Sequence, residues 1–510
     1  MLPSSGRTQP PWYIDEDPLI PEPLEGDERT EVCIVGAGIA GIMTAYLLSR
    51  AGRQVVVLDD GPVGGGETGR TTAHLSNALD DRFIHLERLH GQDGARRAAA
   101  SHAAAIDVIE ATIREEQIAC DFVRLDGYLF RPPGDDSDIL ERELAAARRA
   151  GLLEVERLPR APMAPFDTGP CLRFPRQAQF HPLRFLNQVA RAVQRLGGRI
   201  ALAHVTDCDA GPPARVISAR GIVTCDAAVF ATNSPIIDRF AIHTKQAPYR
   251  TYAIAARLPL GTMEPALYWD TLDPYHYVRL ERDLLIVGGE DHKTGQADDG
   301  DRRFARLEAW TRERFPIGEV VNRWSGQVLE PVDGLAFIGR DPGTDRNVFI
   351  ATGDSGHGMT HGTIAGVLLR DLIVGRENDW EQLYAPDRVP LRAFGEYLRE
   401  NVNVAGQYAD LVTGGDVASE ADISPGRGAV VREGLRKLAV YHGEDGVIRR
   451  LSAICPHLGC VVQWNSTEGT WDCPCHGSRF AVDGTVLNGP SPSGLTHEAA
   501  SPASQAPQPG

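Results

Sequence analysis

Residues 31–60 read EVCIVGAGIAGIMTAYLLSRAGRQVVVLDD, and this stretch decides the fold of the N-terminal part of the chain. An apolar strand over Val32–Val35 runs into a G-x-G-x-x-G pattern. The spacing then predicts a helix over Ile39–Ala51 and a second strand over Val55–Leu58. Strand, glycine turn, helix and strand in this order predict a doubly wound α/β domain. The glycines of the pattern are Gly36, Gly38 and Gly41.

This arrangement is typical of a dinucleotide-binding site. The first glycine allows the tight turn, the second lets a pyrophosphate approach the backbone, and the third lets the helix pack on the strand. The helix N-terminus offers free N–H groups to the pyrophosphate. Asp59 ends the second strand, where an acid can bond a ribose hydroxyl. The pattern alone does not separate FAD from NAD.

The chain over residues 31–375 resembles the D-amino-acid-oxidase-like family of FAD-dependent oxidoreductases. Two further stretches carry the resemblance: GGGETGRTTAHLSN at Gly64–Asn77 and ATGDSGHGMTHGTIAG at Ala351–Gly366. The resemblance implies a Rossmann-type FAD-binding domain with an inserted α+β substrate domain. It also implies contacts with FAD from Arg70, Thr71, Thr72, Gly353, Gly356, Gly358 and Met359.

His74 occupies a place that resembles that of a histidine bonded covalently to FAD in some amine dehydrogenases of this family. Those relatives carry a tryptophan before the histidine, and this chain has Ala73 there. The difference favours a polar pocket or packing role for His74.

The family's usual substrates are amines, amino acids and related C–N or C–OH compounds. Of the candidate pocket residues, His357 is expected to contact flavin or substrate, Arg250 to bind a substrate carboxylate, and Tyr252 to lie beside them. No general base is assigned. The remaining candidates are Tyr249, Tyr275, His276, His292 and His361.

Four cysteines and two histidines crowd into two short segments near the C-terminus. The first reads CPHLGC over Cys455–Cys460, and the second reads CPCHGSRF over Cys473–Phe480. Each supplies one C-x-H or C-x-x-H pair, so two thiolates and two imidazoles form the ligand set. A [2Fe–2S] cluster and a tetrahedral zinc site both accept two cysteines and two histidines. The spacing and the surplus pair of cysteines favour the cluster. The predicted ligands are Cys455, His457, Cys473 and His476.

Residues 415–490 resemble the Rieske [2Fe–2S] domain, which is all-β. The resemblance implies that Cys460 and Cys475 form a disulfide joining the two loops. Ser478 matches a serine of high-potential members, whereas Phe480 replaces a hydrogen-bonding tyrosine. We therefore expect a reduction potential below those of respiratory-complex Rieske centres and above those of plant-type ferredoxins.

Net charge and composition limit the kinds of partner that the protein can bind. The net charge of −17 argues against nucleic acid or an anionic membrane as the main partner. No apolar run is long enough to span a bilayer, and residues 1–30 lack a signal core, so we expect a cytoplasmic protein. The expected domains are a disordered arm (1–30), the oxidoreductase domain (31–375), a linker (376–414), the Rieske domain (415–490) and a disordered tail (491–510).

Both cofactors together predict a dehydrogenase in which a small-molecule substrate reduces FAD and the cluster passes single electrons to an external acceptor. Two alternatives stay open. The cluster can instead feed FAD from an outside donor, or the protein is a redox sensor whose flavin never meets substrate. No 2-His-1-carboxylate motif follows the Rieske segment, which argues against a hydroxylase.

Overall fold

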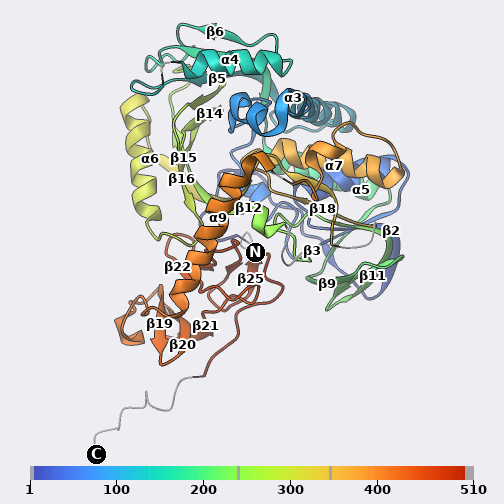
Figure 1. The fold of residues 1–510 in the computed structure, drawn as a ribbon, viewed down its shortest axis with the longest axis vertical. Coiled ribbons are helices and arrows are strands. Elements are labelled where there is room, and N and C mark those ends of the chain that lie inside the picture. The colour runs from blue at the N-terminus through green and yellow to red at the C-terminus, as the bar shows by residue number, and fades with distance from the viewer. Residues whose placement is uncertain (1–4, 137, 238–241, 344–346, 390, 500–510) are drawn as a thin grey trace, which may run out of the picture.

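The computed structural model describes residues 5–136, 138–237, 242–343, 347–389 and 391–499. The chain forms a large N-terminal domain built on two sheets and a smaller C-terminal domain, joined by a helical segment (Figure 1). The predicted architecture, an α/β domain with an inserted α+β part and a following all-β domain, is confirmed.

The first sheet of the N-terminal domain is a doubly wound, mainly parallel sheet. Strand β2 pairs in parallel with β3 on one side and β11 on the other, and β11 pairs in parallel with β18. In sheet order the path runs through β1 (Glu22–Pro23), β8 (Arg199–Leu202), β3 (Val55–Asp59), β2 (Glu28–Val35), β11 (Gly221–Phe230), β10 (Ala214–Ser218) and β9 (Val205–Asp209). Off this path, β18 (Val348–Thr352) pairs with β11, and β17 (Phe337–Arg340) pairs with β18.

Helices α2 (Ile39–Arg50) and α7 (Gly358–Val374) cross this sheet in close contact. A Cβ atom at Gly362 would lie 2.6 Å from Ile39, and one at Gly366 would lie 2.9 Å from the Met43 backbone. Glycine at these positions therefore lets the two helices approach. Further helices of the domain are α3 (Arg82–Glu116), α4 (Ile139–Arg149) and α5 (Pro182–Arg195).

The second sheet forms the inserted part. Its order is β16 (Val320–Pro331), β12 (Gln246–Arg257), β15 (Leu284–Lys293), β14 (Tyr277–Glu281), β13 (Leu267–Asp270), β5 (Val123–Phe130), β7 (Cys171–Gln179) and β4 (His74–Leu75), with β6 (Glu156–Leu158) on β7. Helix α6 (Gly300–Arg314) covers its outer face (Figure 1).

The C-terminal domain has two small antiparallel sheets. One contains β19 (Arg427–Glu433), β20 (Arg436–His442) and β21 (Ile448–Ser452). The other contains β22 (Gln463–Asn465), β23 (Thr470–Asp472), β24 (Arg479–Phe480) and β25 (Val486–Asn488). The cysteine-rich loops connect β21 to β22 and β23 to β24.

Residues 376–414 connect the domains mainly as helices. They include α8 (Glu381–Tyr384) and α9 (Phe394–Gln407), which runs from the N-terminal domain towards the C-terminal one (Figure 1). Among the described residues no helix is long and apolar enough to cross a membrane.

Both predicted disordered ends need correction. Residues 5–30 contain α1 (Trp12–Asp15) and β1, and Trp12 is buried against the core. After the last strand, Leu495 is buried and His497 bridges to Leu451. Polar and proline-rich composition suggested disorder, but these ends find partners on the surfaces of distant elements. Residues 1–4 and 500–510 lie outside the described part of the chain.

Candidate active site and metal centre

A cavity of about 940 Å³, here called the central cavity, lies where the parallel strands of the first sheet meet the second sheet. Its volume is at the upper end of the range for ligand pockets, about 300–1,000 Å³. Of the predicted FAD contacts, all but Gly41 line it: Gly36, Gly38, Asp59, Arg70, Thr71, Thr72, Gly353, Gly356, Gly358 and Met359.

The first glycine turn has the geometry that a dinucleotide needs. Gly36 has φ +106°, and a Cβ atom there would lie 2.3 Å from the Ala231 carbonyl oxygen. A Cβ atom at Gly41 would lie 1.8 Å from the Gly36 oxygen, so Gly41 serves helix packing. Asp59 accepts hydrogen bonds from the backbone N–H groups of Ala37 (2.6 Å) and Gly61 (2.8 Å). Burial raises the pKa of Asp59 to about 7.

The second glycine turn joins β18 to α7 and lines the same cavity. Gly353 and Gly356 have φ +74° and +75°, which favours glycine at both positions. Helix α7 then begins at Gly358, so its free N–H groups point towards the cavity edge. This helix N-terminus can stabilise negative charge on a bound ring.

His357 lines the cavity but is held by an acid. Its Nε2 atom lies 3.2 Å from a carboxylate oxygen of Asp80, whose other oxygen accepts from the Tyr275 hydroxyl at 2.5 Å. Burial alone would lower the pKa of His357, but Asp80 outweighs it and raises that pKa. The sequence did not single out Asp80.

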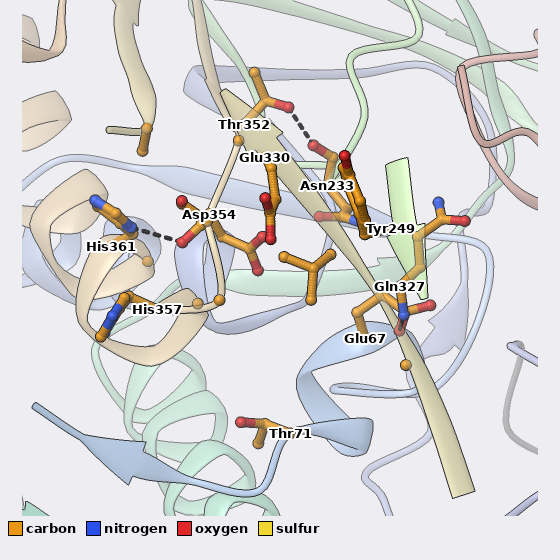
Figure 2. A pocket seen from close by; sticks show the side chains of 18 of the residues that line it. Glu67, Thr71, Asn233, Tyr249, Gln327, Glu330, Thr352, Asp354, His357 and His361 are labelled. Atoms are coloured by element: carbon orange, nitrogen blue, oxygen red, sulfur yellow. Dashed lines mark hydrogen bonds between the residues drawn. The ribbon is translucent and has the colours of Figure 1, made fainter. Parts of the chain in front are cut away.

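Two other histidines of the cavity wall are neutral. Burial lowers the pKa of both His361 and His74 to about 3. His361 Nδ1 bonds the Asp354 carbonyl oxygen at 2.8 Å (Figure 2). His74 Nδ1 faces the Thr72 hydroxyl at 3.1 Å, and its buried Nε2 has no hydrogen-bond partner among the described residues.

Three further acids line the cavity, and none was predicted. Burial raises the pKa of Asp291 to about 7 and that of Asp354 to about 6, and it raises the pKa of Glu330 well above its usual value. Figure 2 shows Glu330 and Asp354 in the wall near Tyr249. Asp354 stands within the second glycine stretch, so its position could have been found from the sequence. Asp291 and Glu330 reach the cavity only through the pairing of β15 and β16 with β12.

Arg250 and Tyr252, which we predicted to contact substrate, do not line the central cavity. Strand β12 alternates, and Tyr249 and Thr251 face the cavity while Arg250 and Tyr252 face away from it. Strand β12 therefore does line the cavity, as predicted, but through the residues on its other face. His276, which pairs with Asp270, and His292, which stacks on Tyr252, also lie outside the lining.

The face of β12 and β16 that points away from the cavity docks the C-terminal domain through a buried ionic cluster. We call this group the buried ion cluster. Glu468 lies 3.2 Å from Arg70 and 3.8 Å from Arg250, and it also accepts from the Ser325 hydroxyl. Its members, three guanidinium and three carboxyl groups, are Arg70, Arg250, Arg479, Glu67, Glu468 and Asp472.

Arg70 thus belongs to this cluster through its guanidinium, although the residue also borders the cavity. The N-terminal arm completes the contact. Thr8 accepts from Arg70 and donates its backbone N–H to Glu468 at 3.0 Å, and Ser5 accepts from Arg479.

The predicted metal ligands come together at one end of the C-terminal domain. Each loop closes on itself: the Cys455 N–H donates to the Cys460 carbonyl oxygen at 2.9 Å, and the Cys473 N–H donates to Ser478 O at 2.8 Å. The rings of His457 and His476 lie 5.0 Å apart, nearly perpendicular. The thiols of Cys455 and Cys473 are hydrogen-bonding neighbours.

These residues fit a two-iron cluster. Cys460 and Cys475 form a disulfide, so they tie the loops together and are not available as ligands. Buried His476 has no hydrogen-bond partner at Nδ1 among the described residues, as expected of an atom that binds metal. Burial lowers its pKa to about 3, which keeps the imidazole in the neutral form that ligates metals.

Two family models match the chain. The model for FAD-dependent oxidoreductases (DAO) matches residues 31–372, and the model for the Rieske [2Fe-2S] domain matches residues 415–498. The second match extends past the predicted domain end at residue 490 and includes the ordered segment around Leu495.

Relatives share one or both parts. The Bacillus subtilis protein YhfW, whose name describes a Rieske 2Fe-2S iron-sulfur protein, is 31% identical over 94% of this chain and 95% of its own. γ-Glutamylputrescine oxidoreductase of Escherichia coli is 28% identical over 68% of this chain and 84% of its own. Glycine oxidase from Geobacillus kaustophilus shares the fold, with a TM-score of 0.60 and 18% identity, over 71% of this chain and 99% of its own.

Proposed function

Because the chain belongs to the DAO family of FAD-dependent oxidoreductases and carries a Rieske [2Fe-2S] domain, we propose that it is a dehydrogenase for a small, positively charged amine. When bound, FAD supplies a two-electron acceptor for hydride and the cluster supplies a one-electron carrier. An external one-electron acceptor then takes the electrons from the protein.

The charge of the central cavity is the observation on which we base the choice of a cationic substrate. Its lining contains four arginines and eleven acids, and because Arg70 and Glu67 both belong to the buried ion cluster, three arginines and ten acids remain. The acids are Asp59, Asp60, Glu67, Asp80, Asp81, Asp273, Asp291, Glu330, Asp354, Glu396 and Glu400. Such an excess favours a cationic ligand over an anionic one.

Aromatic side chains of the same cavity support this choice. Tyr249, Tyr275, Tyr277, Trp269 and Trp324 line it, and their ring faces attract cations. Arg250, the residue expected to bind a substrate carboxylate, instead points into the domain interface. The similarity to γ-glutamylputrescine oxidoreductase also supports an amine.

The same proposal assigns the binding residues. Gly36, Gly38 and Asp59 hold the dinucleotide part of FAD, and Gly353, Gly356 and the start of α7 border its ring. His357, held by Asp80, contacts flavin or substrate from the α7 side. Cys455, His457, Cys473 and His476 bind the cluster. Five other cysteines are thiols in the structure, which supports a cytoplasmic location: Cys33, Cys120, Cys171, Cys208 and Cys225.

Anaerobic mixing tests the proposal. The holoenzyme is mixed with a linear diamine or with an amino acid of similar length, and flavin and cluster absorbance are followed separately. We expect the diamine to bleach the flavin first and the cluster second, with the amino acid much slower. Bleaching by the amino acid alone would contradict the cationic-substrate assignment, and cluster reduction before flavin reduction would reverse the direction of flow.

A pair of variants checks the cavity charge. Asp354→Asn removes a lining carboxyl group whose pKa of about 6 leaves it mainly charged at pH 8, whereas Glu308→Gln removes an acid on α6 that pairs with surface arginines. We expect KM for the diamine at pH 8 to rise in Asp354→Asn and to stay unchanged in Glu308→Gln. Equal KM values in both variants would oppose the role of cavity charge.

A further inference from the structure

We propose that Gln327 and His243 are positioning residues that hold the cluster-binding loops against the wall of the central cavity, so that electrons cross between the two redox sites without domain movement. This inference rests on the proposed function only for the direction of electron transfer, from FAD to the cluster. Each oxidised substrate yields two electrons, so two successive one-electron transfers are needed, with a one-electron acceptor emptying the cluster after each.

The wall between the two sites is a single β-sheet layer. On β16, Trp324, Gly326, Val328 and Glu330 line the central cavity. On the same strand, Ser325 donates a hydrogen bond to Glu468 of the C-terminal domain. Gln327 borders the cavity as well, but its side chain donates to Gly477 of the C-terminal domain. One sheet with its side chains is about 10 Å thick.

The Gln327 side chain joins this sheet layer to a cluster-binding loop through one hydrogen bond. Its Nε2 atom donates to the Gly477 carbonyl oxygen at 3.0 Å, and Gly477 directly follows the predicted ligand His476. The side chain is buried, and its Oε1 atom has no hydrogen-bond partner among the described residues. Gln327 therefore connects the cavity wall to the peptide next to a ligand histidine, and Figure 2 shows it at the cavity edge beside Glu67.

Glycine at position 477 makes this approach possible. Gly477 has φ +79°, and a Cβ atom there would lie 2.6 Å from Pro248 Cβ and 2.9 Å from Gln327 Nε2. Pro248 belongs to β12, so both strands of the wall touch the cluster loop. Any larger residue would push the loop away.

His243 covers the histidine edge of the cluster site from the N-terminal domain. It lies in the short helix η2 (His243–Lys245), which runs into β12. Its ring centroid lies 4.9 Å from that of His457 and 5.9 Å from that of His476. The histidine edge therefore faces the flavin-binding domain and not solvent.

The docked arrangement has further support. Asn488 and Gly489 of the C-terminal domain line the central cavity themselves, and a Cβ atom at Gly489 would lie 3.0 Å from Ile236. The buried ion cluster fixes the same interface. Contacts on both sides of the cluster loops thus hold the two sites at a constant separation.

Photoreduction of bound FAD tests the proposal without substrate, so a wrong substrate class cannot affect the outcome. The holoenzyme is illuminated anaerobically with EDTA, and the lag between flavin and cluster reduction is measured. We expect Gln327→Met to lengthen the lag, because losing a hydrogen bond worth about 1.4 kcal/mol lowers the ratio of docked to undocked loop tenfold. The electron paramagnetic resonance (EPR) spectrum of the dithionite-reduced cluster should also shift.

Gln179→Met is the matched control. Gln179 is likewise buried, donates to a backbone carbonyl (Leu280, 2.6 Å) and leaves its Oε1 unpaired, but it lies away from the cluster. For His243, alanine should lengthen the lag and phenylalanine should restore it. Flavin and iron content check that each variant is assembled. A lag and EPR spectrum in Gln327→Met equal to those of Gln179→Met, or a normal lag in His243→Ala, would overturn the proposal.

Discussion

Replacing Glu468 with glutamine should release the C-terminal domain from the N-terminal one. The Glu468 side chain is fully buried and contacts two arginines, Ser325 and the N-terminal arm. Although burial alone would raise the pKa of Glu468, Arg70 and Arg250 hold it below its usual value. The carboxylate therefore stays charged at neutral pH, and its stabilising effect is lost only as the pH falls through that lowered pKa.

The magnitude follows from the charge balance. The buried ion cluster contains three positive and three negative groups, so Glu468→Gln leaves one uncompensated positive charge in the interface. Breaking a buried pair in this way costs about 3–5 kcal/mol. Because the amide keeps part of the hydrogen bonding, we take about 3 kcal/mol, which raises the undocked population by roughly two orders of magnitude.

Amide hydrogen exchange can measure this change. The Arg7 N–H of the N-terminal arm donates to the Glu468 backbone carbonyl oxygen at 3.1 Å across the interface, so its exchange rate should report the undocked population when docking is fast. We expect roughly 100-fold faster exchange of this N–H in Glu468→Gln and a rate within about fivefold of the wild type in Glu308→Gln, because Glu308 forms only surface pairs. Equal exchange rates in the two variants would refute the view that the ion cluster holds the interface.

Three other changes test separate parts of the structure. Gly36→Ala should lower the flavin-to-iron ratio of purified protein, because its Cβ atom would lie 2.3 Å from the Ala231 oxygen; an unchanged ratio would contradict this role for Gly36. Phe480→Tyr should raise the midpoint potential of the cluster in an EPR-monitored titration, because it adds a hydrogen-bond donor near the cluster loops; a fall would argue against it. A quaternary ammonium ligand, whose own charge is fixed, should bind more weakly as the pH falls through about 7, where Asp291 becomes protonated; Asp291→Asn should flatten this dependence, and a flat wild-type curve would oppose it.

Local patterns predicted the parts of the protein that are set by local geometry. The helix predicted at Ile39–Ala51 forms as α2 over Ile39–Arg50, because a glycine turn must follow the strand. The disulfide between Cys460 and Cys475, which the resemblance to the Rieske domain implied, is present in the structure. Both features depend on residues that are close in sequence, and the geometry of each feature allows few alternatives.

Long-range pairing set the parts that the sequence did not reveal. Tyr249 and Arg250 differ only in which face of β12 they occupy, and that face is decided by β15, β16 and the docked domain. No local signal places Gln327 or His243 beside the cluster loops. The composition of the first thirty residues likewise concealed the buried contacts of Ser5 and Thr8.

One measurement tests the central claim most directly: freeze-quench EPR of the anaerobic holoenzyme after mixing with a linear diamine. If one chain joins an amine-oxidising flavin to a cluster held by Cys455, His457, Cys473 and His476, a reduced Rieske-type signal should grow in after the flavin bleaches. A bleached flavin with no such signal, or a protein that contains zinc and no iron, would contradict the account.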